Sequence, residues 1–141
     1  NVCVSSKRFE GIKKLRDAGI YTGVLMMPLL PFINDTKDNI DKIINQAYKS
    51  RANFIYPMFG VTLRSNQRFY YYTKLRENFP NLVSKYQNLY SDKYVCNSPN
   101  FKSLQKYFKE KCSKLGITYK MDDIISEYKS KFESEQISFD L

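Results

Sequence analysis

The histidine and cysteine content of this sequence narrows the chemistry that its side chains can carry. The 141 residues include no histidine, so a Ser-His-Asp triad, a histidine general base and a histidine-ligated zinc site are impossible within the chain. The three cysteines, Cys3, Cys96 and Cys112, are too far apart in sequence to form a short metal-binding motif. We therefore expect no catalytic residue and no metal ligand in this chain, and we expect Cys112 to be a buried structural thiol.

Side chains suited to binding a ligand follow two segments that predict buried strands. Ligands of parallel α/β proteins bind on the loops after the carboxyl ends of strands. The loop 28–35 combines rigid prolines and apolar side chains with two short polar ones, which suits an adenine or a thioether. An arginine after the second strand, and another in the first turn of the first helix, can pair with a carboxylate or phosphate. The candidate cofactor-binding residues are Arg8, Pro28, Leu29, Pro31, Asn34, Asp35 and Arg64.

Two of these assignments have a structural alternative. The run Asn34-Asp35-Thr36 precedes a helical pattern, and helix capping alone explains short polar residues at that place. Arg64 stands where the sequence pattern changes, so it is also explained as a residue at a domain junction. Both alternatives remain open from the sequence.

The elements that must position these residues alternate along the first half of the chain. Helical spacing marks residues 5–19 and 36–50, the second with Ile40, Ile43, Ile44 and Ala47 on its inner face. An apolar run at 20–27 predicts a strand buried on both faces, as in a parallel sheet. Residues 52–60 predict the next strand, which Pro57 should make irregular or short. Two such strands do not make a stable sheet by themselves. The pattern therefore predicts a slice of a larger α/β sheet or barrel.

From residue 65 onward the apolar spacing is helical throughout. We predict a first segment at 1–64 and a mainly helical second segment at 65–141. The expected inner faces are Phe69, Tyr72, Leu75 and Phe79; Leu82, Tyr86 and Leu89; and Phe101, Leu104, Phe108, Cys112 and Leu115.

The formal net charge is +9, which favours anionic partners such as nucleic acid, although a lysine-rich solvated surface explains it equally. The run Tyr70–Tyr72 beside Arg68 and Lys74 resembles a nucleic-acid surface. Consecutive residues of a helix point in different directions, however, so at most two of the tyrosines share a face and Tyr72 is expected in the core. Lys102, Lys106 and Lys109 share one helical face, which is a solvated face or a phosphate-binding stripe. No run of about 18 apolar residues predicts a membrane span, and no signal peptide is recognisable, so we expect a cytoplasmic location.

Three segments in order resemble one known family. Residues 8–15 (RFEGIKKL), 18–20 (AGI) and 28–35 (PLLPFIND) are similar to the pattern R-x-E-A-[IL]-x-x-L-x-x-A-G-I, a strand, and P-[IL]-[IL]-P-x-[IL]-N-D. This pattern is typical of the radical S-adenosylmethionine (SAM) proteins related to spore photoproduct lyase, also called DNA repair photolyase-like. Residues 62–64 and 96–100 resemble the C-terminal region of some members. Gly11 stands where the family usually has alanine.

The resemblance implies a partial (β/α)6 barrel of the TIM type that binds a [4Fe–4S] cluster and SAM. In the family, reduction of SAM gives a 5′-deoxyadenosyl radical that abstracts hydrogen from a substrate. The family's cluster motif, C-x-x-x-C-x-x-C, has no match in this chain. The resemblance therefore implies the last two barrel strands and a helical C-terminal region, with Arg8 and the loop 28–35 at the SAM end. Such a fragment would be inactive alone and would bind neither SAM nor cluster.

The partner implied by this interpretation is the N-terminal barrel half of the same polypeptide. Exposed strand edges could instead pair in a homodimer. The alternative function is a free-standing basic helical module that binds nucleic acid or protein. The substrate is not defined by any motif in the sequence.

Overall fold

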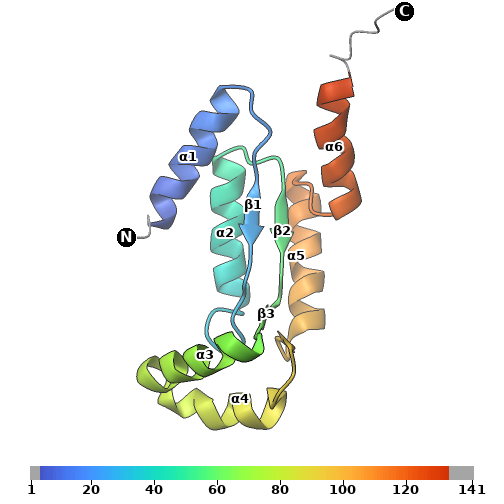
Figure 1. Cartoon of the computed structure of the whole chain (residues 1–141). Coiled ribbons are helices and arrows are strands. Elements are labelled where there is room, and N and C mark those ends of the chain that lie inside the picture. Colours follow the sequence, from blue (N-terminus) through green and yellow to red (C-terminus); the bar gives the residue numbers. More distant parts are fainter. Residues whose placement is uncertain (1–3, 134–141) are drawn as a thin grey trace, which may run out of the picture.

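The computed structural model of the chain describes residues 4–133 and has an α/β fold (Figure 1). The α/β class predicted from the sequence is confirmed, whereas the membership of a barrel stays a prediction. The helices are α1 (Ser5–Asp17), α2 (Lys37–Lys49), α3 (Ser65–Asn78), the 3-10 helix η1 (Pro80–Leu82), α4 (Val83–Tyr90), α5 (Phe101–Leu115) and α6 (Met121–Glu133). The strands are β1 (Val24–Met26), β2 (Ile55–Pro57), β3 (Gly60–Thr62) and β4 (Val95–Asn97).

Strands β1 and β2 are parallel and are joined through α2, as the alternation of patterns predicts. Their register pairs Val24 with Ile55 and Met26 with Pro57. The apolar run at 52–60 does not form one strand, because the chain leaves β2 after Pro57 and begins β3 at Gly60. Strand β3 pairs with β4 in antiparallel fashion, and this second small sheet was not predicted from the sequence.

A third segment lies parallel to β2 on the edge away from β1. The Ile55 N–H donates to the Thr118 carbonyl at 2.9 Å, and the Thr118 N–H donates to the Asn53 carbonyl at 3.2 Å. On this edge of β2 the next backbone donor after Ile55 would be residue 57, which is a proline and has no N–H. The described pairing is a single bridge, between Phe54 and Thr118.

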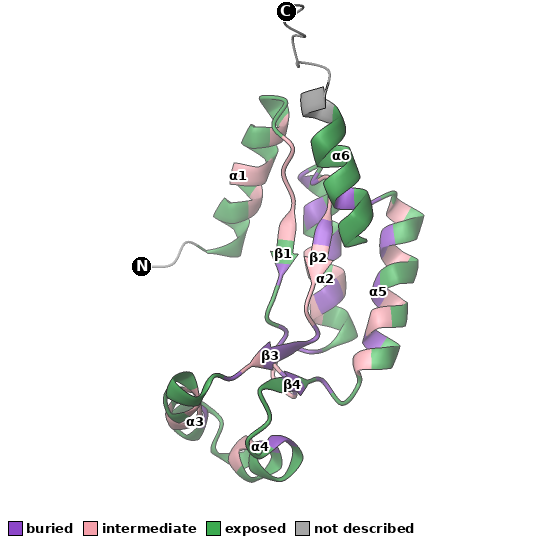
Figure 2. Cartoon of the chain, turned by 45° about the vertical axis from the view of Figure 1, so that its right-hand side comes forward, coloured by how far each residue is buried: buried purple, intermediate pink, exposed green. Residues whose placement is uncertain are grey.

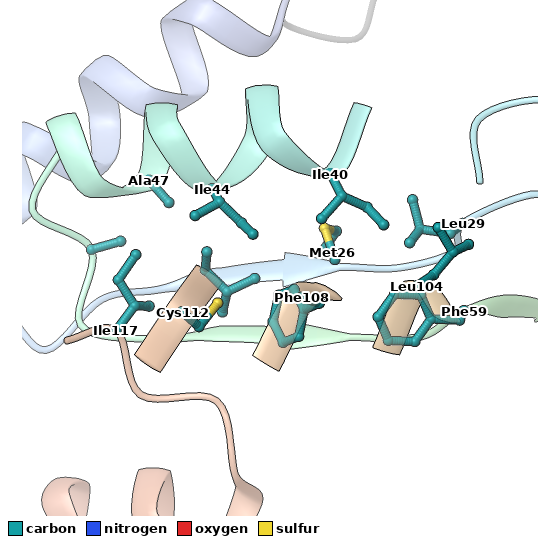
Figure 3. Close-up of a cluster of buried hydrophobic side chains, with 12 residues drawn as sticks. Met26, Leu29, Ile40, Ile44, Ala47, Phe59, Leu104, Phe108, Cys112 and Ile117 are labelled. Carbon is teal, nitrogen blue, oxygen red and sulfur yellow. The ribbon is translucent and has the colours of Figure 1, made fainter. Parts of the chain in front are cut away.

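Helices α2 and α5 cover one face of β1 and β2 and form the main core. Figure 3 shows Ile40, Ile44 and Ala47 of α2 pointing toward the strands, with Phe108 and Cys112 of α5 in the same cluster. All five side chains are almost completely buried. The predicted inner faces of these two helices are confirmed, and burial raises the pKa of the Cys112 thiol to about 12.

The two core helices are also joined at their surface by polar contacts. The Lys111 ammonium lies 3.1 Å from an Asp41 carboxylate oxygen. A hydrogen bond from Tyr107, and then the contact with Lys111, lowers the pKa of the Asp41 carboxyl. The ionised carboxylate therefore stabilises the packing of α5 on α2.

The face of the strands opposite the core helices is open at β1. Leu25, between Val24 and Met26, points to this face and is 64% exposed. Phe9 and Ile12 of α1 pack against the same cluster as α2 and α5, which places the three helices on one side of the strands. At the amino ends of the strands, Glu127 of α6 accepts hydrogen bonds from the hydroxyls of Tyr21 and Thr118.

A second cluster is built by the segment between β2 and α5, which lies beyond the carboxyl ends of β1 and β2 (Figure 1). Its buried members are Val61, Leu63, Leu75, Tyr86, Tyr90 and Cys96. Much of α3 and α4 is exposed in Figure 2, and buried positions on them are few. We call residues 59–100 the inserted segment, because they separate β2 from α5.

The predicted inner faces of α3 and α4 are partly wrong. Phe69 is 82% exposed and Phe79 is 44% exposed, whereas Leu75 is buried. Apolar side chains occur on every side of α3, so their spacing does not single out one inner face. On α4 the inner positions are Tyr86 and Tyr90, and Leu89 is exposed.

The predicted division between residues 64 and 65 stays a prediction. Helix α5 belongs to the second predicted segment and packs on α2, which belongs to the first. Among the described residues, no helix has the length and apolar character needed to cross a membrane.

Candidate functional site

A groove of about 510 Å³ lies between α1 and β1 and reaches the start of α2. It follows the outer edge of β1, which pairs with no strand in the described part of the chain apart from β2 on its other side. Four of the seven candidate residues line this groove, namely Arg8, Pro28, Leu29 and Asn34. The structure therefore brings Arg8 of α1 and the start of the loop 28–35 to one groove.

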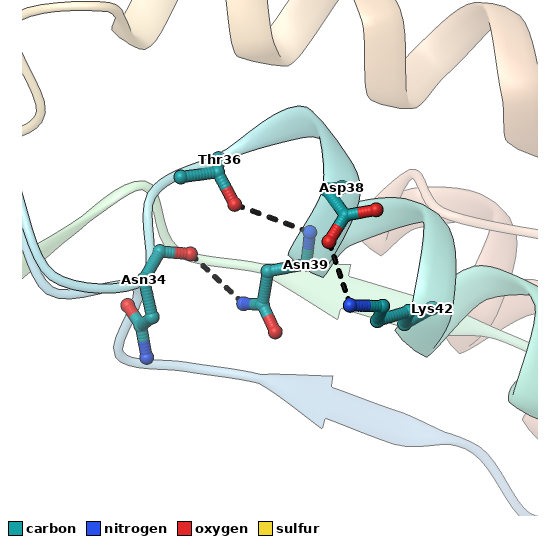
Figure 4. Close-up of polar contacts among 5 residues, drawn as sticks. All are labelled: Asn34, Thr36, Asp38, Asn39 and Lys42. Carbon is teal, nitrogen blue, oxygen red and sulfur yellow. Dashed lines mark hydrogen bonds and ion pairs between the residues drawn. The ribbon is translucent and has the colours of Figure 1, made fainter.

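The loop 28–35 is held by hydrogen bonds of Asn34. The Asn34 side-chain oxygen accepts from the Leu30 N–H at 2.5 Å, and the Asn39 side chain donates to the Asn34 carbonyl at 2.8 Å. Figure 4 shows Asn34 and Asn39 joined in this way beside the first turn of α2. Sequence reasoning missed Asn39, although it also lines the groove.

Thr36 caps helix α2, which decides one alternative that the sequence left open. Its hydroxyl accepts from the Asn39 N–H at 3.2 Å. Asn34 is therefore free of the capping role and shapes the loop instead. The neighbouring Asp38 and Lys42 form an exposed pair at 2.7 Å (Figure 4), which contributes little to stability.

Pro31 and Asp35 do not line the groove, because both are buried against the inserted segment. The Ser98 hydroxyl donates to the Asp35 carboxylate at 2.5 Å, and both residues are buried. The Tyr86 hydroxyl donates to the Pro31 carbonyl at 2.6 Å. These two contacts attach the loop to the inserted segment, and no sequence signal pointed to Ser98 or to the hydroxyl of Tyr86 as partners of the loop.

Arg64 lies outside the groove as well. It is the residue before the first turn of α3 and is exposed. A hydrogen bond from Arg64 lowers the pKa of the Tyr94 phenol. This position agrees with the alternative interpretation of Arg64 as a junction residue, and a role for any of the seven residues in cofactor binding stays a prediction.

The groove combines apolar walls with a few hydrogen-bonding groups. Phe9 and Ile12 of α1 line it together with Leu25 and Met27 of the β1 segment, and Leu25 and Met27 are 64% and 38% exposed. Arg8 adds a positive charge, and no carboxylate lines the groove. Such a groove can bind an extended or apolar ligand that carries a carboxylate, but it contains no group suited to proton transfer.

Metal-binding potential is limited in the described part of the chain. No cluster of three or more His, Cys, Asp or Glu side chains occurs among those residues. Cys96 and Cys112 are both free and buried, and Cys3 lies outside the described residues.

The chain is similar to uncharacterized proteins of Mycobacterium bovis and Mycobacterium tuberculosis. Each match is 32% identical over 83 residues, which is 59% of this chain and 24% of the relative. The matched segment is thus about a quarter of the length of these curated relatives. No family model matches the chain. No solved structure matches it either.

Proposed function

We propose that this chain is the C-terminal part of a radical SAM enzyme of the spore photoproduct lyase-like type. Strand β1 carries the proposal. Its outer edge is unpaired in the described part of the chain, while α1 lies along that edge on the same side of the strands as α2 and α5. A helix in this position is typical of a right-handed connection from a preceding parallel strand. The preceding strand would then occupy the part of the groove that runs along β1. A ligand would occupy the part beyond the carboxyl ends of the strands.

The open strand face and the relatives support the same proposal. Leu25 is exposed on the face opposite the helices, which in a barrel would be the interior. The similar segment is 24% of the relatives' length, so most of each relative lies outside the similarity. The partner proposed for this chain is therefore an N-terminal barrel half that belongs to the same polypeptide.

In this function the chain supplies binding groups and no cluster ligand. When bound, SAM and the [4Fe–4S] cluster would supply the 5′-deoxyadenosyl radical. Arg8 would pair with the carboxylate of SAM, since arginine binds carboxylates through two parallel hydrogen bonds. Pro28, Leu29 and Asn34 would form an apolar wall with one amide. Pro31 and Asp35 would fix that wall through their buried contacts with the inserted segment.

The experiment uses the full-length product of the gene that encodes this chain, reconstituted anaerobically with iron and sulfide. We expect a [4Fe–4S] absorption spectrum and release of 5′-deoxyadenosine from SAM after reduction. Arg8→Gln should weaken SAM binding about tenfold, as expected for the loss of a charge-assisted hydrogen bond, and leave the iron content unchanged. Lys14→Gln removes the same charge from an exposed position of α1 that does not line the groove, and should behave as wild type.

Two results would overturn the proposal. A full-length protein that takes up no cluster would exclude the radical SAM reaction. Equal SAM affinity in Arg8→Gln and Lys14→Gln would show that Arg8 does not bind SAM. The 141-residue chain alone should bind SAM weakly or not at all, because it lacks the cluster motif.

A second candidate function rests on the exposed aromatic side chains of α3. Phe69 and Tyr70 are 82% and 66% exposed, and the Lys74 ammonium lies 5.9 Å from the centre of the Tyr70 ring. Exposed rings beside a cation are typical of surfaces on which single-stranded nucleic acid stacks.

Fluorescence anisotropy with a labelled single-stranded oligonucleotide tests this second function. Phe69→Ala should weaken binding about tenfold if a base stacks on the ring, whereas Phe79→Ala, an exposed aromatic at the other end of α3, should have little effect. Equal loss in the two variants, or binding that does not weaken with salt, would contradict it.

A further inference from the structure

A second cavity lies on the other edge of the parallel strands, between β2, α5 and residues 119–121. Its volume is about 540 Å³, which is within the range of pockets that hold small molecules. The groove beside α1 follows the opposite edge, along β1. The second cavity therefore does not depend on the proposed function or on any strand that pairs with β1.

The cavity lies where the chain after Thr118 leaves β2. Thr118 pairs beside Phe54, and Pro57 has no N–H to donate to a continued strand on this edge. Tyr119, Lys120 and Met121 line the cavity on the side away from β2, and α6 begins at Met121. Side chains of α5 line the space between β2 and residues 119–121.

The floor of this cavity is made of aromatic rings in mutual contact. Phe59 packs edge-on against Phe101 and Phe108, with ring centres 5.9 and 5.8 Å apart. Phe108 makes the same kind of contact with Tyr119 at 5.8 Å. Phe59 and Phe108 are almost completely buried, so the floor is fixed by the core. Tyr56 adds a partly exposed ring at the wall.

The rim of the cavity carries positive charge and no negative charge. Lys109 of α5 and Lys120 are exposed and line the opening, while Gln105 and Asn97 add two amides. No aspartate or glutamate lines the cavity. An aromatic floor under two lysines is complementary to a flat ring that carries an anionic group, because the ring packs on the floor and the charge stays at the wet rim.

We propose that this cavity binds a planar aromatic anion, with its ring against the partly exposed Phe101 and Tyr119, which Phe59 and Phe108 support from below, and its charged group between Lys109 and Lys120. The shared chemistry is that of an aromatic carboxylate and of a nucleoside monophosphate. An aromatic carboxylate and a nucleoside monophosphate differ in the position and charge of the anionic group. The cavity should therefore bind them with different affinities. The sequence analysis placed Lys109 in a stripe with Lys102 and Lys106, which do not line this cavity, and the resemblance does not point to this site.

The experiment is an NMR titration of the full 141-residue chain with naphthoate, with adenosine monophosphate and with uncharged naphthylmethanol. We expect one anion to bind with chemical-shift changes around Tyr119 and Gln105, and about tenfold more tightly than naphthylmethanol. The anion that binds more tightly identifies the chemical class of the ligand, aromatic carboxylate or nucleoside monophosphate. Lys109→Gln with Lys120→Gln should remove that tenfold advantage and leave naphthylmethanol binding unchanged.

Two further variants make the test specific. Lys102→Gln with Lys106→Gln removes the same charge from α5 at exposed positions that do not line the cavity, and should bind the anion as wild type. Gln105→Trp should fill the half-buried wall and abolish binding of all three compounds. No binding of either anion at millimolar concentration, or equal losses in the two lysine pairs, would overturn the proposal without affecting the radical SAM proposal, whose site is on the other edge.

Discussion

Replacing Tyr86 by phenylalanine tests whether the inserted segment fixes the loop 28–35. The Tyr86 side chain is completely buried; its hydroxyl donates to the Pro31 carbonyl at 2.6 Å and accepts from the Tyr71 hydroxyl at 3.0 Å. Removing one oxygen leaves two polar groups without their partner. Loss of a hydrogen-bond partner for a buried polar group costs about 1–3 kcal/mol, so we expect Tyr86→Phe to lower the free energy of unfolding by ~2 kcal/mol. At this chain length that corresponds to a fall in Tm of roughly 6 °C.

Urea unfolding followed by circular dichroism measures this change, and Tyr71→Phe is the matched control. Tyr71 is only half-buried, and its hydroxyl donates to Tyr86 alone, so its loss should cost less, about 0.5–1 kcal/mol. The double variant should cost less than the sum of the two, because both single changes break the same bond. Amide exchange at Asn34 should accelerate in Tyr86→Phe and not in Tyr71→Phe. A Tyr86→Phe protein within about 0.5 kcal/mol of wild type, with unchanged exchange at Asn34, would refute this reasoning.

Three further predictions concern packing and charge. Gly23→Ala should destabilise by about 1–3 kcal/mol, because its Cβ would lie 2.5 Å from a phenyl carbon of the neighbouring strand; Gly11→Ala, with open space around it, should stabilise α1 by about 0.5–1 kcal/mol. Thermal unfolding of both variants decides this, and a stabilising Gly23→Ala would contradict the close approach. Phe108→Ala should cost about 3–5 kcal/mol, whereas Phe69→Ala, mostly exposed, should stay within about 0.5 kcal/mol of wild type in urea. Asp41→Asn should destabilise at neutral pH, and its difference from wild type should shrink as the pH falls from the ordinary carboxyl pKa of 3.8 through the lower folded pKa. A difference that does not shrink in acid would argue against the ionised carboxylate.

The part of the fold that could be predicted is the part in which one face of an element is apolar. On α5, Leu104, Phe108 and Cys112 recur on one face and all three are buried. On α2 the isoleucines and Ala47 recur in the same way. The parallel pair of strands follows from the alternation of these helices with apolar runs, so the α/β class could be derived without contacts.

The rest depends on contacts between residues that are distant in sequence. Strands β3 and β4 have three residues each and lie more than thirty positions apart, so neither is long enough to show a period. Thr118 makes a single bridge. On α3, Phe69 and Leu75 are equally apolar, yet tertiary packing buries only Leu75.

In the candidate site, too, local sequence identified some features and distant contacts decided the others. Asn34 was predicted to bind a ligand or to cap the next helix; in the structure Thr36 caps the helix and Asn34 holds the loop through Leu30. Asp35 looked equivalent in the sequence, but Ser98 draws its carboxylate into the inserted segment. A local motif therefore identified the loop, whereas the direction of each side chain was decided by a segment more than sixty residues away.

The two edges of the parallel strands differ in what they can accept, and proline decides the difference. The outer edge of β1 has no proline between Val24 and Met26, so every backbone group needed by a further parallel strand is available there. The outer edge of β2 ends at Pro57, where a further strand would lose a ladder bond, and Thr118 already pairs beside Phe54 on that edge. A polypeptide strand is therefore expected beside β1 and a small molecule beside β2. If a second copy of this chain paired along β1, the same rule would apply, and sedimentation would show a dimer whose formation Leu25→Pro prevents.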